Sequence, residues 1–274
     1  MTLGFCDSLV LGAALVVTSA GGLAAEAHDP VTVSHGYSYF GDLKYPADFA
    51  HLDYVNPAAP KGGEISQWSF GTFDSFNPYA RKGNQAALSS IPFETVMTSF
   101  ADDATASYCF LCTTVEYPKS LDWAIFTLRD DVRFSDGSAL TAEDVKFSFN
   151  LFMEQGLPSY RAAVSGMVAE IEILSPLQIK FTFTEDAPRR DVIDLAGGIP
   201  VFSKAWFEST GARLDDSSLI PFIGTGPYVL DSYEVNQRVI YVRRDDYWGK
   251  AIPPNIGRNN FDRIRVEYFA DSAA

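Results

Sequence analysis

The stretch RFSDGSALTAEDVKFSF, residues 133–149, predicts a turn followed by a capped helix. Asp136 and Gly137 form a turn dipeptide, because glycine adopts a positive φ at little steric cost. Thr141 is followed three residues later by Asp144, which resembles a capping box with aspartate in place of the usual glutamate. Apolar residues then recur at helical spacing and predict a buried helix face: Ala142, Val145, Phe149 and Phe152. The polar residues of this stretch therefore have structural roles that need no active site.

The segments on both sides of this stretch predict strands and helices in mixed order. Alternating residues predict strands at 64–70, within 122–134, twice within 168–185, twice within 224–249, and at 261–270. Helices are expected at 86–100, where Pro92 would kink the helix or mark its start, and within 197–210. Residues 33–63 are expected to form an irregular arm around a core, and residues 71–85 a loop. Because strands and helices do not alternate strictly, the predicted fold class is α/β with a mixed sheet.

Composition and charge exclude one class of partner. The chain has 274 residues, of which 47% are hydrophobic, as expected for a globular protein of one large or two modest domains. Its formal net charge is −14. The densest basic positions are the pairs Arg189-Arg190 and Arg243-Arg244, and a nucleic-acid-binding surface needs more. No nucleic acid partner is therefore expected.

Residues 1–27 are predicted to be a secretory signal peptide. Residues 9–17 form an apolar run, and Ala25-Glu26-Ala27 fits a small-x-small cleavage site. The usual positive charge before the apolar run is missing, since Lys44 is the first basic residue. The alternative, an uncleaved membrane anchor, needs an apolar run of about 20 residues. We therefore expect an exported, periplasmic protein.

The two cysteines of the expected mature chain, Cys109 and Cys112, lie in the segment YCFLCTT. In an oxidising compartment they are expected to form a local structural disulfide or to remain as two buried thiols. A redox role is the alternative, but Phe110 and Leu111 make the segment apolar, whereas catalytic thiols need an electropositive and partly exposed setting.

No motif in the chain indicates an enzyme. The three histidines lie near the start of the expected mature chain and lack metal-ligand spacing, so neither a metal nor a cofactor is expected. Gly224-Thr225-Gly226 is followed at once by Pro227, which excludes a dinucleotide-binding helix start. A secreted glycan hydrolase stays open as an alternative, and it would need two carboxylates facing one cleft. An exported aromatic-rich chain without catalytic groups is typical of a binding protein.

Five stretches of the sequence resemble a known family. Residues 123–149, WAIFTLRDDVRFSDGSALTAEDVKFSF, resemble the signature of the family 5 extracellular solute-binding proteins, the peptide receptors of ABC importers. IGTGPYVL at 223–230, RRDDYWGK at 243–250 and FDRIRVEYFAD at 261–271 resemble later blocks of that family in the same order. HGYSYFGDLKYPADFAHLDYVNPAAPKGG at 35–63 is similar to the Yej-type branch, whose members import oligopeptides and microcin C-like peptides.

The resemblance implies a fold and a role. The fold would be that of a type II periplasmic binding protein, with a first lobe formed by residues 28–84 and 187–274 and a smaller inserted α/β domain at 85–186. Members are longer and have a second lobe that has no counterpart here, so a truncated fragment without transport function is the alternative. The implied role is a monomeric, non-enzymatic periplasmic receptor that delivers oligopeptides to an inner-membrane ABC permease.

The resemblance also implies where a ligand would bind. The loop after the first predicted strand of the lobe, residues 71–78, resembles the family segment that borders the cleft. Its backbone is expected to pair with an extended peptide by strand addition. The predicted ligand contacts are Phe73, Asp74, Ser75, Phe76 and Asn77. The alternative is that Phe73 and Phe76 belong to the core.

Overall fold

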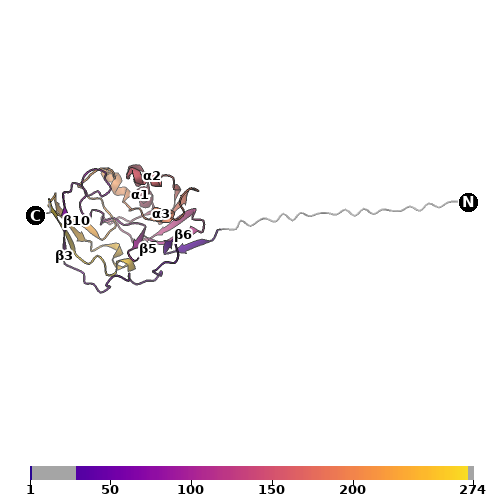
Figure 1. The fold of residues 1–274 in the computed structure, drawn as a ribbon, viewed down its shortest axis with the longest axis horizontal. Coiled ribbons are helices and arrows are strands. Elements are labelled where there is room, and N and C mark those ends of the chain that lie inside the picture. Colours follow the sequence, from indigo (N-terminus) through magenta and orange to yellow (C-terminus); the bar gives the residue numbers. More distant parts are fainter. Residues whose placement is uncertain (2–28, 271–274) are drawn as a thin grey trace.

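Within the part of the chain that the structure describes, the strands form three sheets (Figure 1). The computed structural model describes Met1 and residues 29–270, so nearly all of the predicted signal peptide lies outside the described residues. The largest sheet has the order β1-β6-β7-β9-β8, and all its neighbouring strands are antiparallel. Its strands are β1 (Val31–Ser34), β6 (Cys112–Pro118), β7 (Trp123–Leu128), β9 (Gln178–Phe183) and β8 (Val168–Ser175).

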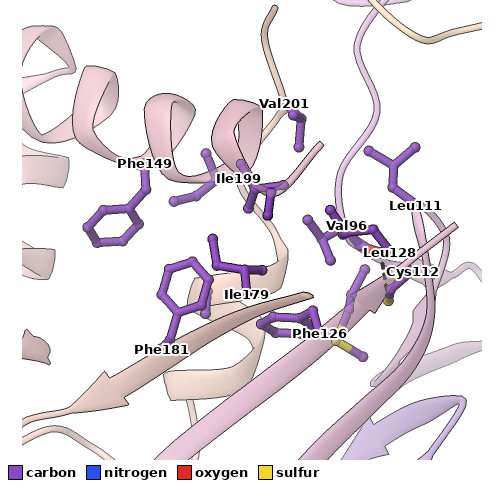
Figure 2. Packing of buried hydrophobic residues seen from close by; sticks show 14 of the residues in the cluster. Val96, Leu111, Cys112, Phe126, Leu128, Phe149, Ile179, Phe181, Ile199 and Val201 are labelled. Carbon is purple, nitrogen blue, oxygen red and sulfur yellow. Dashed lines mark hydrogen bonds between the residues drawn. The ribbon is translucent and has the colours of Figure 1, made fainter. Parts of the chain in front are cut away.

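One face of this sheet carries the main core. Helix α1 (Ala142–Gln155) packs on it, and helix α2 (Pro158–Val164) follows α1 directly. Figure 2 shows Phe149 of α1 pointing down toward Phe181 of β9, with ring centroids 5.7 Å apart. Phe126 of β7 continues the layer at 5.9 Å from Phe181. Both Phe126 and Phe181 are fully buried, as alternation along half-buried strands requires.

The second sheet joins segments from the two ends of the described chain. Its order is β10-β11-β12-β3, with strands β10 (Tyr228–Glu234), β11 (Arg238–Arg243), β12 (Arg263–Phe269) and β3 (Glu64–Phe70). β12 and β3 are parallel and run in register from Arg263 opposite Glu64 to Phe269 opposite Phe70. The inner face packs on a separate small core that contains Tyr228, Tyr241 and Ile264.

The third sheet has the order β2-β5-β4 and supports the irregular arm. Its strands are β2 (Gly36–Ser38), β5 (Asp103–Cys109) and β4 (Met97–Phe100). The arm after β2 packs Tyr45 and Leu52 against Phe100 and Tyr108 in a third core. Short helices complete the fold: α3 (Val192–Gly197), α4 (Lys204–Thr210), and the 3-10 turns η1 (Trp248–Ala251) and η2 (Pro253–Asn255).

The predicted turn and capped helix are confirmed. Gly137 has a φ of +86°, which suits glycine. The Asp144 carboxylate accepts hydrogen bonds from the backbone N–H (2.9 Å) and the hydroxyl (3.0 Å) of Thr141. It also accepts one from the backbone N–H of Lys204 at 2.9 Å. Asp144 therefore closes the start of α1 and attaches the start of α4 to it.

The prediction of a helix at 86–100 is wrong. This segment forms turns and then strand β4. The Pro92 carbonyl accepts a hydrogen bond from the backbone N–H of Gly226 at 2.8 Å, and a side chain at Gly224 would lie 2.0 Å from the same oxygen. The two backbones thus pack directly against each other, and this tertiary contact replaces a local helix.

The predicted domain boundaries do not separate the cores. β1, assigned to the first lobe, pairs with β6, which was assigned to the inserted domain. Residues beyond 187, including Phe202, Phe207 and Phe222, belong to the same hydrophobic cluster as Phe126 and Phe181. The division into residues 28–84 with 187–274, and 85–186, stays a prediction, and these contacts show that the two parts pack against each other. The Cys109–Cys112 disulfide is confirmed between β5 and β6.

Candidate ligand-binding site

The two phenylalanines predicted to contact a ligand are buried. Phe73 is 1% exposed and Phe76 is 3% exposed. Their rings lie 5.7 Å apart and pack in the small core beneath the second sheet. Ligand contact by these two side chains stays a prediction, and their burial favours the alternative of a core role. Sequence alone does not distinguish ligand contact from a core role, because an aromatic residue in a loop is compatible with both.

Ser75 and Asn77 hold the loop in place from within. The Asn77 side-chain amide donates to the backbone carbonyls of Leu214 (2.9 Å) and Asp216 (2.8 Å). The Ser75 hydroxyl oxygen accepts from the backbone N–H groups of Asn77 (3.0 Å) and Ser218 (3.1 Å). Both residues are 1% exposed, and their polar side-chain groups bond to neighbouring backbone.

Asp74 is the one residue of the predicted set that is exposed. Its carboxylate accepts the backbone N–H of Asn84 at 2.7 Å, and its own backbone N–H donates to the Asn84 carbonyl at 2.9 Å. A short parallel bridge between Ser75 and Gln85 extends this contact. The loop is therefore a rigid rim that follows directly on β3.

Strand β3 presents an aromatic edge that the sequence analysis did not single out. Trp68 and Phe70 are 66% and 56% exposed, and their rings lie 4.7 Å apart. Phe269 of β12, directly opposite Phe70 in the register, is 38% exposed. Within the described residues, β3 has a neighbour on one side only, so its other edge is free (Figure 1). The usable signal was two aromatic residues two positions apart in a strand.

A second polar centre joins three distant segments at Glu94. Its carboxylate accepts hydrogen bonds from the Thr225 hydroxyl (2.8 Å), the Trp248 indole N–H (3.2 Å) and the Tyr247 hydroxyl. Burial raises the pKa of the Glu94 carboxyl to about 7, against the effect of these three donors. Glu94 lies on the wall of a cavity of about 370 Å³ and connects the 223–230 and 243–250 blocks. A lone glutamate carries no sequence signature, which is why it was missed.

Two features that would bear on function are absent from residues 29–270. No group of three or more histidine, cysteine or acidic side chains is arranged there to hold a metal ion. None of the helices in that part of the chain is long and apolar enough to cross a membrane.

Comparison with known proteins places these features in a family. The sequence model described as bacterial extracellular solute-binding proteins, family 5 Middle, matches residues 118–274. The chain is 38% identical over 241 residues to an Agrobacterium fabrum protein named "Probable peptide-binding protein YejA", covering 86% of this chain and 39% of that protein. It is 35% identical over 243 residues to the peptidoglycan-binding protein YepA of the same organism, covering 86% of this chain and 39% of YepA.

The structure gives the same result at the level of fold. It superposes on the periplasmic binding protein DppA of Helicobacter pylori, solved with the peptide STSA, with a TM-score of 0.62 and 21% identity. The match covers 78% of this chain and 44% of DppA. The type II periplasmic binding protein fold is thereby confirmed, and these relatives are named as binding proteins rather than enzymes. The chain spans less than half the length of each of these proteins, and it belongs to the family 5 bacterial extracellular solute-binding proteins, close to their Yej-type members.

Proposed function

We propose that this chain is the ligand-contacting part of a periplasmic receptor that binds oligopeptides and delivers them to an inner-membrane ABC permease. The family membership and the peptide-binding names of its relatives support this role. The receptor binds without chemical conversion and acts as a monomer.

The aromatic edge of β3 is the observation that carries the proposal. An extended peptide binds a free strand edge through backbone hydrogen bonds, while its side chains lie on alternate faces. Trp68 and Phe70 lie two residues apart and therefore share one face, at the roughly 7 Å spacing of alternate residues in a paired peptide. The loop that contains Asp74 follows directly after the C-terminal end of β3 and therefore lies at one end of the free strand edge. The ligand contacts that we assign are thus Trp68, Phe70 and Asp74.

The peptide class is tested by calorimetric titration of the chain with an oligopeptide library and, separately, with peptidoglycan-derived peptides. The second titration is included because the relative YepA is named a peptidoglycan-binding protein. Saturable binding in one of the two titrations is expected, and the ligand that binds defines the peptide class. A folded chain that binds neither would overturn the proposal.

The assigned edge is tested by one variant and its control. Trp68→Ala is expected to weaken binding about fivefold to tenfold, because a stacked aromatic contact contributes about 1–1.4 kcal/mol. The control is Tyr54→Ala. Tyr54 is another exposed aromatic residue, 48% exposed, and it lies in the irregular segment 33–63. Equal affinities of the two variants would show that the edge of β3 is not where the peptide lies.

A further inference from the structure

A cavity at the opposite end of β3 and β12 gathers positive charge in a strongly acidic chain. It has a volume of about 260 Å³, and five cationic side chains line it with one carboxylate, that of Asp245. The cations are Lys61, Arg243, Arg244, Lys250 and Arg258. The whole chain has 21 lysines and arginines against 35 acidic residues, so this grouping runs against its overall charge.

Two of the five cations have acidic partners. Arg243 pairs with Asp262 at 2.5 Å, and Arg244 pairs with Asp246 at 3.1 Å. Arg244 is also buried, and its guanidinium donates to backbone carbonyls, including that of Phe134 at 3.1 Å. The side chains of these two arginines are therefore held in place by protein groups.

The other three cations donate to neutral acceptors. Lys61 Nζ donates to the Asn260 side-chain oxygen at 2.9 Å and to the Arg258 carbonyl. Lys250 Nζ donates to the Asp245 carbonyl at 3.2 Å, and Arg258 donates to the Pro254 carbonyl at 3.4 Å. No carboxylate of residues 29–270 lies within ion-pair distance of these three groups. Each therefore keeps N–H groups available to an anion.

Positive charge exceeds negative charge among the lining side chains and the aspartates paired with them. Counting Asp245 and the two paired aspartates against the five cations leaves a net charge of +2. Burial lowers the pKa of Lys61, and the neighbouring Arg243 charge lowers it further. A bound anion would relieve this repulsion between like charges.

We propose that this cavity binds a phosphate group. A phosphate group carries a charge of about −1.5 to −2 near pH 7 and offers three or more acceptor oxygens, which match the net charge and the available donors. A single carboxylate would compensate only half of the charge. The volume exceeds that of the group itself, so the phosphate of a larger molecule also fits.

This site is distinct from the proposed peptide edge. Lys61 precedes β3, and Asp262, the partner of Arg243, precedes β12, whereas Phe70 and Phe269 end the two strands. Seven-residue strands span about 20 Å from end to end. Failure of one proposal therefore leaves the other standing.

Calorimetric titration of the 274-residue chain with inorganic phosphate tests the site, at constant ionic strength set with sodium chloride. Saturable one-to-one binding is expected. The double variant Lys250→Gln/Arg258→Gln removes two exposed side chains that bond only to backbone carbonyls, and it is expected to weaken binding at least tenfold. Lys82→Gln/Lys119→Gln removes the same charge from exposed positions elsewhere and is expected to bind as the parent chain does.

Vesicles distinguish the two sources of a phosphate group. A lipid headgroup would be identified by three results with phosphatidylglycerol vesicles. The parent chain binds them, the Lys250→Gln/Arg258→Gln variant does not, and added phosphate releases the parent chain from them. Binding of phosphate without binding of these vesicles would identify a soluble phosphate compound. The proposal fails if phosphate gives no saturable heat, or if both double variants bind it equally while urea unfolding shows both to be folded.

Discussion

Replacing Glu94 by glutamine is expected to change how stability depends on pH. In the unfolded chain this carboxyl group titrates near its ordinary pKa of 4.5, and in the folded protein burial raises the pKa to about 7. Between these values the folded state holds a proton that the unfolded state has lost. The free energy of unfolding therefore falls as pH rises from 4.5 to 7, and this contribution is fully present only below pH 4.5.

The size of this effect follows from the shift. A difference of one pKa unit corresponds to about 1.4 kcal/mol, so the rise from 4.5 to about 7 amounts to about 3 kcal/mol. Glutamine does not titrate, and it keeps one oxygen that can accept from Thr225 or Tyr247. Glu94→Gln therefore adds a constant cost and removes the pH-dependent part.

Urea unfolding followed by tryptophan fluorescence, repeated from pH 4 to pH 8, measures the quantity required. The free energy of unfolding of the parent minus that of Glu94→Gln is expected to fall by about 3 kcal/mol between pH 4.5 and 7.5. Contributions of other titrating groups cancel in this difference. Tyr247→Phe removes a donor that lowers the pKa of Glu94, so its decline in stability should extend to higher pH. A pH-independent difference between parent and Glu94→Gln would refute the reasoning.

Three further substitutions test structural roles by urea unfolding. Asp144→Ala should lower the free energy of unfolding by about 2–4 kcal/mol, because it leaves the N–H of Lys204 and the cap without an acceptor; Asp144→Asn keeps one acceptor oxygen and should lose less, and equal losses of the two variants would contradict this acceptor role. Asn77→Ala should cost about 2–3 kcal/mol, since two backbone carbonyls lose their donor; unchanged stability would return this side chain to the ligand-binding candidates. Replacing Cys109 and Cys112 together by serine should cost about 2 kcal/mol without reductant, and a parent chain no more stable than the variant would contradict a stabilising disulfide.

Local patterns were predictable from sequence and distant pairings were not. The cap, the turn at Gly137 and strands such as β8 and β9 depend on residues within a few positions of one another. β1 pairs with β6, where Val31 lies opposite Pro118. A short sequence pattern does not predict which distant strand a given strand pairs with. The same reason explains the wrong helix at 86–100, whose conformation is decided by Gly224 and Gly226.

The site that we propose lies next to the segment that the sequence singled out, but it uses other side chains. The sequence pointed to residues 71–78, and the structure places a rigid loop there, at the end of the aromatic edge. Burial of Phe73 and exposure of Trp68 depend on the packing of β12 and on the open edge of β3, which composition does not encode. The cationic cavity escaped notice for the same reason, since Lys61 joins Arg258 only after folding.

The parallel pairing of β3 with β12 has a consequence for the order of synthesis. A ribosome adds about 5–20 residues per second, so about 200 residues separate the emergence of the two strands by roughly 10–40 seconds. Throughout this interval β3 lacks the neighbour that pairs with it in the folded protein, so both of its edges offer unpaired backbone groups. Contacts of such high sequence separation also form slowly once the chain is complete. The sheet of β3 is thus the last of the three that can close, and the interval before closure is when this chain most needs a holding chaperone.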